Sequence, residues 1–365
     1  MAHSQSSHRR LRNWVLVLVT IGAAVILTMA APVPLWRTGR EAVVPLSLIS
    51  GGPAVLQSSR LWVDTDAACG ATPRTDPDDC FAIAWLVANG HDIVGISTSF
   101  GNASGGVVFD TTNTLVAKIT TDGHGAIPVW RGWAGPVVDE PNIVLDSRAA
   151  LRSALAEGPL TILALGPLTN IADALEGRPD LQRNVTRLVA VMGHQAGHLF
   201  HPSEASGRGM LLGHGPIFRD INFDKDKAAA ESILQMHLPL TLIPYDAAIR
   251  VGITAADLEA LGRQGPALSW VAGTAKGWLE FWNSEIGQPS FYPFDWVAAA
   301  YVAQPRLFNC AETSVWIATE WAFWIYPRES LLVGTLANQP KAIALYCPQT
   351  APSLHDYLLR YTADL

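Results

Sequence analysis

Charged residues are scarce in this chain. Only 16% of its 365 residues are charged, against 49% that are hydrophobic, so the chain can bury a sizeable core and is not a disordered protein. Lys and Arg number 25 against 32 Asp and Glu, which gives a formal net charge of -7. Because nucleic-acid surfaces depend on clustered Lys and Arg, this balance argues against a nucleic-acid partner. It favours a small substrate that is uncharged or is held through a cation.

Cysteine is also rare, with four in the whole chain. None belongs to a Cys-x-x-Cys motif, which excludes the common metal and redox sites of that type. By position the four fall into two pairs, Cys69 with Cys80 and Cys310 with Cys347. In an oxidising compartment they could form two disulfides. Four buried free thiols are the alternative, because unpaired cysteine is among the most buried residue types.

Charge is absent from residues 14–31, which follow a basic patch in the first twelve residues. The run approaches the roughly 20 apolar residues that cross a membrane, and the positive flank should stay cytoplasmic. We interpret residues 1–13 as a cytoplasmic tail and 14–36 as a membrane anchor, or as a signal segment if the chain is cleaved there. Residues 37–60 would be a linker and 61–365 a folded domain outside the cytoplasm, anchored or secreted.

From residue 61 onward, short apolar runs alternate with segments of helical period, and no internal repeat is evident. This pattern predicts an α/β fold with an open, mostly parallel sheet and flanking helices. The expected strands are 61–64, 93–98, 127–130, 161–165, 188–192, 240–244, 313–324 and 341–346. The expected helices are 79–89, 107–120, 147–156, 168–175, 225–236 and a longer stretch at 255–285.

Five aspartates crowd the first expected strand and the helix after it. Asp64 and Asp66 end the strand, and Asp76, Asp78 and Asp79 lie at the start of the helix. Open α/β folds build their sites at this edge of the sheet, and helix capping would need only one carboxylate. Carboxylates gathered there repel each other unless a divalent cation joins them. An all-oxygen set suits calcium better than zinc, with magnesium as the alternative.

Several motifs in a fixed order resemble the inosine-uridine preferring nucleoside hydrolases. The segment from Asp64 to Asp79 is similar to that family's Asp-x-Asp-Pro-Gly-x-Asp-Asp signature. Four further family motifs follow, namely a strand ending in Gly-Asn (96–102), a Gly-Pro-Leu-Thr-Asn turn (166–170), a Met-Gly-Gly strand end (191–193) and a Glu-Phe-Asn segment (220–229). Asp295 stands where the family has a His-Asp pair. The match runs from residue 61 to about 310, and its specificity lies in the ordered set.

Carried over by position, the resemblance implies a calcium site and a ribose site in a nucleoside hydrolase-like fold. The implied metal ligands are Asp66, Asp79, Asp295 and the backbone carbonyl of Leu165. The implied ribose ligands are Asp78, Asn102, Asp220 and Asn222. Asp64 would hold the metal ligands from behind, a role that orients the ligands.

The activity implied by the resemblance is hydrolysis of the N-glycosidic bond of ribonucleosides to free base and ribose. A calcium-bound water would attack the anomeric carbon, with Asp66 taking its proton, while the sugar gains oxocarbenium character. The expected partners are a small-molecule nucleoside and the membrane through the N-terminal helix. A homo-oligomer is an option.

Three departures from the family pattern affect the expected site. Residues 67–75 replace a compact Pro-Gly turn with a longer loop, and Phe294 replaces a histidine associated with protonation of the leaving base. His214 stands where the family has an asparagine. We hypothesise that His214, or a neighbouring histidine of the same glycine-rich stretch (His194, His198 or His201), supplies the acid. Exposed loop histidines without a catalytic role are the alternative.

Two other functions fit part of the pattern. A non-catalytic nucleoside-binding protein that retains the calcium pocket would accommodate Phe294 and His214. A phosphatase of the haloacid dehalogenase type would use Asp64 and Asp66 as nucleophile and acid. That second function leaves the turn at 166–170 and Asp295 unexplained.

Overall fold

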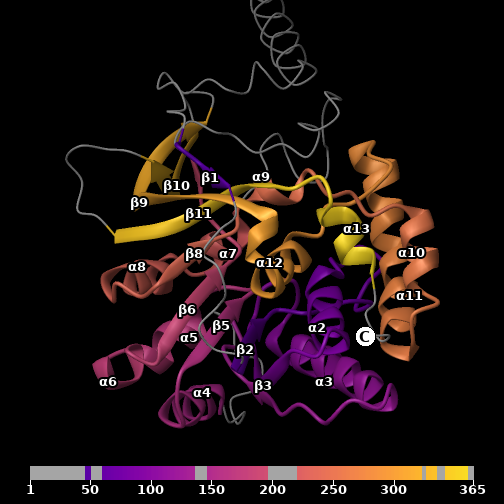
Figure 1. Ribbon diagram of the computed structural model, residues 1–365, viewed down its shortest axis with the longest axis horizontal. Coiled ribbons are helices and arrows are strands. Elements are labelled where there is room, and N and C mark those ends of the chain that lie inside the picture. The colour runs from indigo at the N-terminus through magenta and orange to yellow at the C-terminus, as the bar shows by residue number, and fades with distance from the viewer. Residues whose placement is uncertain are drawn as a thin grey trace, which may run out of the picture.

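A single sheet runs through the described part of the chain, and the segments that bear the predicted site lie on its parallel half (Figure 1). The computed structural model describes residues 46–50, 60–135, 146–195, 220–322, 326–334 and 342–360. The parallel strands lie in the order β4 (Val129–Arg131), β3 (Asp92–Thr98), β2 (Arg60–Thr65), β5 (Leu160–Ala164), β6 (Val185–Ala190) and β8 (Leu240–Leu242). The predicted mostly parallel α/β sheet is therefore confirmed.

The sheet continues into strands from the C-terminal part of the chain. β11 (Ala342–Thr350) pairs with β8 in parallel, and β9 (Phe308–Ala322) pairs with β11 and with β10 (Tyr326–Gly334) in antiparallel fashion. The two-residue strand β7 (His194–Gln195) lies beside β10. β1 (Ile49–Ser50), inside the predicted linker 37–60, pairs with β9. The sequence analysis placed strands at 313–324 and 341–346 but did not predict β10.

Helices cover both faces of the sheet because the buried strands are apolar on both sides. In β2, Leu61 and Val63 join one hydrophobic cluster and Trp62 joins the other. The first cluster includes α2 (Asp78–Ala88), α3 (Gly105–Thr121), α11 (Pro266–Phe281) and α12 (Phe294–Ala303). The second includes α4 (Ser147–Ala156), α5 (Thr169–Leu175), α6 (Pro179–Gln182) and α8 (Lys227–Gln235). Smaller elements are α7 (Ile221–Lys225), α9 (Tyr245–Ala248), α10 (Ala255–Leu261), the π-helix η3 (Trp282–Ile286), the short η4 (Pro305–Leu307) and α13 (Leu354–Leu359).

The helix expected at 225–236 corresponds to α8, which begins two residues later because the Asp226 carboxylate accepts a hydrogen bond from the Ala229 amide and caps it. The stretch expected at 255–285 is interrupted between α10 and α11, where Gly265 has a φ of 109° and Pro266 opens the next helix. Capping residues set these boundaries, which helical periodicity alone does not locate.

Two disulfides join the cysteines as paired in the sequence analysis, Cys69 with Cys80 and Cys310 with Cys347. The first ties the loop at 67–75 to α2, and the second ties β9 to β11. The alternative of four free thiols was wrong.

The predicted tail at 1–13 and membrane segment at 14–36 lie outside the described residues. Among the helices that the structure describes, none combines the length and apolarity needed to span a membrane.

Candidate active site

Three aspartates from distant parts of the chain meet at the carboxyl edge of the parallel strands. Asp66 follows β2, Asp79 is the second residue of α2, and Asp295 is the second residue of α12. One carboxylate oxygen from each lies within 4.8 Å of the others, and all three residues are buried. α2 and α12 pack against each other, with the Phe81 and Trp296 rings stacked at 4.9 Å. The helix packing thus brings Asp295 to aspartates more than 200 positions earlier.

Hydrogen bonds fix these carboxylates relative to the backbone. The Thr65 hydroxyl and the Asp66 amide both donate to Oδ1 of Asp79, the amide over 3.2 Å. Asp78 accepts at Oδ2 from the Asp295 amide (3.0 Å), which links the starts of α2 and α12. Asp78, predicted as a ribose ligand, therefore also joins the two helices that carry metal-ligand candidates.

Asp64 lies behind this cluster and is held by the neighbouring strand and turn. Its Oδ2 accepts hydrogen bonds from the Ser97 hydroxyl and from Nδ2 of Asn170, the latter over 2.9 Å. Asn170 also donates to the Thr98 carbonyl (3.1 Å) and accepts from the Trp133 amide (2.8 Å). Asn170 and Ser97 were missed as supporting residues, although the Gly-Pro-Leu-Thr-Asn turn and the polar end of a buried strand were visible in the sequence.

The carboxylates face an unfavourable electrostatic environment. Burial raises the pKa of Asp64 to about 7 and that of Asp79 to about 6. Burial first, and then repulsion from neighbouring aspartates, raises the pKa of Asp66 and Asp295 well above the usual range. No lysine or arginine of the described residues forms an ion pair with these groups. A buried all-oxygen donor set of this charge fits a hard divalent cation, which would favour the ionised forms.

The remaining predicted ligands line the same cavity. The Asn102 amide N–H donates to Asp66 Oδ2 (2.9 Å) and its Nδ2 donates to Asp79 Oδ2 (3.1 Å). Nδ2 of Asn222 donates to the Leu165 carbonyl (2.7 Å), the predicted backbone ligand. Asp220 accepts from the Gly193 amide (2.7 Å) and caps α7. The structure therefore brings together every predicted metal and ribose ligand.

The cavity has a volume of about 850 Å³, and side chains of two chemical kinds line it. The carboxylates and amides described above are the polar part of the lining. Aromatic side chains are the other part, namely Tyr245, Trp270, Trp278, Phe281 and Phe294. Phe294 stacks on Tyr245 at 5.7 Å, and the loop at 67–75 contributes a wall of the cavity. This lining can bind both a polar sugar and a flat ring.

The histidine hypothesis is not supported by the one member that the structure describes. His194 is buried, its Nε2 lies 2.7 Å from a Glu320 carboxylate oxygen, and it does not line the cavity. The contact with Glu320 of β9 thus holds the His194 side chain outside the cavity lining. His198, His201 and His214 lie outside the described residues.

Comparisons with known proteins agree with this architecture. Residues 61–323 match the model of the inosine-uridine preferring nucleoside hydrolase family. The chain is 27% identical over 274 residues to the pyrimidine-specific ribonucleoside hydrolase RihA of Citrobacter koseri, covering 67% of this chain and 81% of that protein. A RihA of Salmonella typhimurium is 27% identical over 227 residues, 60% of this chain and 65% of its own length.

Solved structures share the fold. A plant nucleoside hydrolase, PpNRh1, superposes with a TM-score of 0.66 at 18% identity over 84% of this chain and 99% of its own. A purine-preferring ribonucleoside hydrolase from Gardnerella vaginalis superposes with a TM-score of 0.61 at 17% identity over 82% of this chain and 96% of its own. Because the family model covers most of the chain, this protein belongs to the inosine-uridine preferring nucleoside hydrolase family and is a hydrolase that acts on N-glycosyl compounds.

Proposed function

We propose that this enzyme hydrolyses ribonucleosides with the help of a Ca²⁺ ion held by Asp66, Asp79, Asp295 and the carbonyl of Leu165. The observation that carries the proposal is the convergence of three buried carboxylates, two of which line the cavity. Calcium accepts about six to eight oxygen ligands in flexible geometry, which suits carboxylates and a carbonyl together. Magnesium prefers stricter octahedral geometry and retains more water, so we favour calcium.

When bound, the ion would supply charge that binds the ribose diol and makes the attacking water more acidic. Asp66 is the proposed base that accepts the proton of that water, because its carboxylate faces the cavity and Asn102 holds it in place. Asp64 stays behind Asp66 on β2, where Ser97 and Asn170 fix it, and orients the cluster.

Asp78, Asn102, Asp220 and Asn222 are the proposed ribose ligands. Asp78 begins α2, Asn102 lies in the loop after β3, and Asp220 and Asn222 lie at the start of α7, and all four line the cavity. As the glycosidic bond breaks, positive charge develops on the sugar ring, and nearby carboxylates stabilise it. The aromatic side chains of the cavity lining would receive the base, purine or pyrimidine.

Base release from a panel of purine and pyrimidine nucleosides tests this function. We expect turnover with the purified enzyme, its loss on addition of a calcium chelator, and its return with excess Ca²⁺. Tight nucleoside binding without base release would instead identify a non-catalytic binding protein.

We also propose that the domain works outside the cytoplasm, anchored by residues 14–36 or secreted. Two disulfides support this location because cytoplasmic proteins rarely keep them. Membrane fractionation of cells that express the full chain, with protease added to intact cells, tests it. Protection of the domain from the protease would contradict the proposal.

A further inference from the structure

The fate of the leaving base is the step that the described residues leave most open. Cleavage sends the bonding electron pair to a ring nitrogen of the base, which must be protonated or stabilised as an anion. Phe294 has no proton to give, and no histidine is found among the described residues that line the cavity. The basic residues in that lining are Arg74 and Lys225.

These two basic residues have different neighbours. Lys225 ends α7, three positions after the proposed ribose ligand Asn222, and its Nζ lies 4.4 Å from the centre of the Phe100 ring. Arg74 belongs to the loop at 67–75, and its guanidinium carbon lies 5.3 Å from the centre of the Phe281 ring. Phe281 stacks on Trp278 at 5.2 Å, and both rings line the cavity. Arg74 is thus the cation beside the aromatic side chains that are proposed to receive the base.

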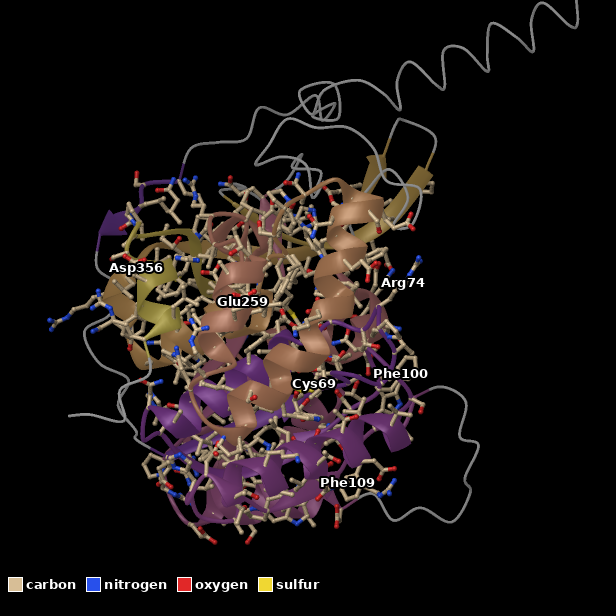
Figure 2. All side chains as sticks on the ribbon, turned by 90° about the vertical axis from the view of Figure 1, so that its right-hand side faces the viewer. Cys69, Arg74, Phe100, Phe109, Glu259 and Asp356 are labelled. Carbon is tan, nitrogen blue, oxygen red and sulfur yellow. A yellow bond between two sulfur atoms is a disulfide. The ribbon has the colours of Figure 1, made fainter. Side chains whose placement is uncertain are left out.

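Contacts with α2 and α11 hold the loop that carries Arg74, and Figure 2 labels its Cys69 and Arg74. Its Cys69 is bonded to Cys80 of α2. A Cβ on Gly277 of α11 would lie 2.5 Å from the Pro73 carbonyl oxygen, so the close approach requires glycine there. Nη2 of Arg74 also lies 3.2 Å from Oε1 of Glu285 in η3. The cation is therefore placed before substrate binds, which lowers the entropic cost of using it.

We propose that Arg74 is a catalytic residue that stabilises the departing base as an anion. The inference rests on the proposed function. The bond between the anomeric carbon and the base nitrogen breaks, its electron pair stays on the base, and the water oxygen bonds to the carbon. Asp66 takes the proton of the water. The guanidinium keeps all its protons and donates hydrogen bonds to the base, which is protonated later by solvent.

The size of the effect follows from the position of Arg74. Removing a donor that stabilises developing negative charge in a closed site lowers kcat by about 10²- to 10³-fold. The Arg74 side chain is 65% exposed, so water screens part of its charge. We therefore expect a loss of about 10- to 100-fold in kcat/KM when the cation is removed.

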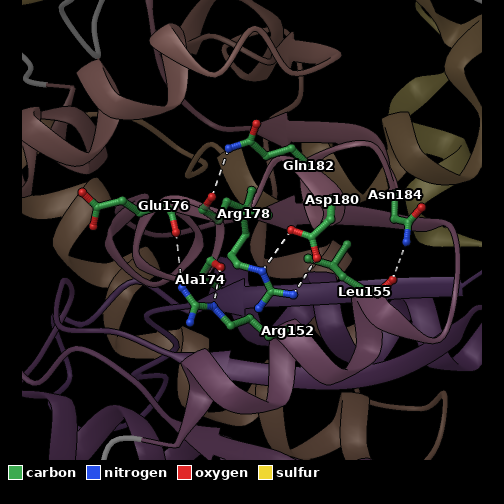
Figure 3. A network of polar contacts seen from close by, with 9 residues as sticks. Arg152, Leu155, Ala174, Glu176, Arg178, Asp180, Gln182 and Asn184 are labelled. Atoms are coloured by element: carbon green, nitrogen blue, oxygen red, sulfur yellow. Dashed lines mark hydrogen bonds and ion pairs between the residues drawn. The ribbon is translucent and has the colours of Figure 1, made fainter.

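Replacing Arg74 with glutamine and varying the leaving group tests the proposal. Arg74→Gln should lose about 10- to 100-fold in kcat/KM on inosine and uridine. It should lose less than about threefold on 4-nitrophenyl β-D-riboside, whose nitrophenolate leaves as a stable anion. Arg74→Lys keeps the charge and should fall between the wild type and Arg74→Gln. The control is Arg178→Gln, which removes an arginine paired with Asp180 outside the cavity, and all three substrates should be unaffected (Figure 3).

Two results would overturn the proposal while leaving the proposed function intact. One is an Arg74→Gln variant whose kcat/KM falls by the same factor on all three substrates while its melting temperature is unchanged. That result would mean that Arg74 acts before the leaving group departs. The other is no loss on inosine or uridine. If the wild type releases neither base nor nitrophenolate, the proposed function itself fails, and that outcome is independent of Arg74.

Discussion

Aspartates in two regions of this molecule differ in whether a neighbouring positive charge balances their negative charge. At the turn around α6, Arg178 donates hydrogen bonds to Asp180 of 3.0 and 2.7 Å and lowers its pKa to about 2 (Figure 3). At the sheet edge, burial raises the pKa of Asp79 to about 6, and its neighbours are other carboxylates. The first region carries its own counter-charge. The second gathers carboxylates with which no lysine or arginine of the described residues forms an ion pair.

The polar contacts around α6 also differ in what they join. Arg152 Nε donates to the Ala174 carbonyl (2.7 Å), and Gln182 and Asn184 donate to the carbonyls of Leu175 and Leu155 over 3.0 and 2.8 Å. These bonds satisfy carbonyls at helix ends, which is a purely structural task. Buried charge without a counter-charge therefore indicates the candidate active site, whereas the presence of polar contacts alone does not.

Replacing Asp66 with asparagine should have the largest effect on turnover, and the matched change in the α6 region should have none. Asp66→Asn removes the proposed base and one proposed metal ligand while keeping the shape, so kcat should fall by at least about 10³-fold. Asp180→Asn removes a carboxylate that pairs with Arg178 at the surface and should leave kcat unchanged. Steady-state base release measures both. A comparable fall in kcat in both variants would contradict the assignment of catalysis to the sheet-edge aspartates.

Calcium should stabilise the sheet-edge cluster, and more so at high pH. Folding raises the pKa of Asp64 and Asp79 from 3.8 to about 7 and about 6, so the folded state holds these protons more tightly than the unfolded state. Their stabilising contribution is present below about pH 4 and is lost as pH rises through 6 to 7. Because metal ligands must be deprotonated, the rise in melting temperature caused by Ca²⁺ should be larger at pH 8 than at pH 5. An equal rise at both pH values would contradict this account.

Asn170 should affect calcium binding and turnover although it does not line the cavity. Asn170→Ala removes the amide that holds Asp64 and the Thr98 carbonyl, so calcium affinity or kcat should fall by about 10- to 100-fold. Asn184→Ala is a matched control, since it removes an amide that serves one carbonyl in the α6 region. Calcium titration of both variants, followed by base release, tests the claim. An Asn170→Ala variant with wild-type calcium affinity and turnover would refute it.

Opening the Cys69–Cys80 disulfide should have the smallest effect, and mainly on substrate binding. The double variant Cys69→Ser, Cys80→Ser frees the loop that forms one cavity wall. KM should rise by about a few fold, because this wall is then no longer pre-organised for substrate binding. The variant Cys310→Ser, Cys347→Ser loosens β9 from β11 and should lower the melting temperature without changing KM. Identical KM values in both variants would show that the loop is held by α11 alone.

Much of the fold and site could be predicted because the relevant signals are local. Asp66 and Asn102 follow apolar strands, which indicated the carboxyl edge of the sheet, and the alternation of strands and helices indicated a mostly parallel sheet. The order of the strands was not predicted. His194 misled the interpretation because β7 buries it against Glu320, a contact that depends on strands 126 positions apart. Arg74 carried no local signal at all. Its role depends on Phe281 and Glu285, which only the packing of the loop on α11 brings near.

The most direct test of the central claim is a calcium titration of base release with the wild type and Asp295→Asn. Asp295 is the proposed ligand that comes from farthest along the chain, so its placement beside Asp66 and Asp79 depends on the complete fold. We expect chelated wild type to regain turnover as Ca²⁺ saturates one site, and Asp295→Asn to need at least about tenfold more Ca²⁺. Full turnover of the chelated enzyme, or an Asp295→Asn variant with the wild-type calcium requirement, would contradict the account.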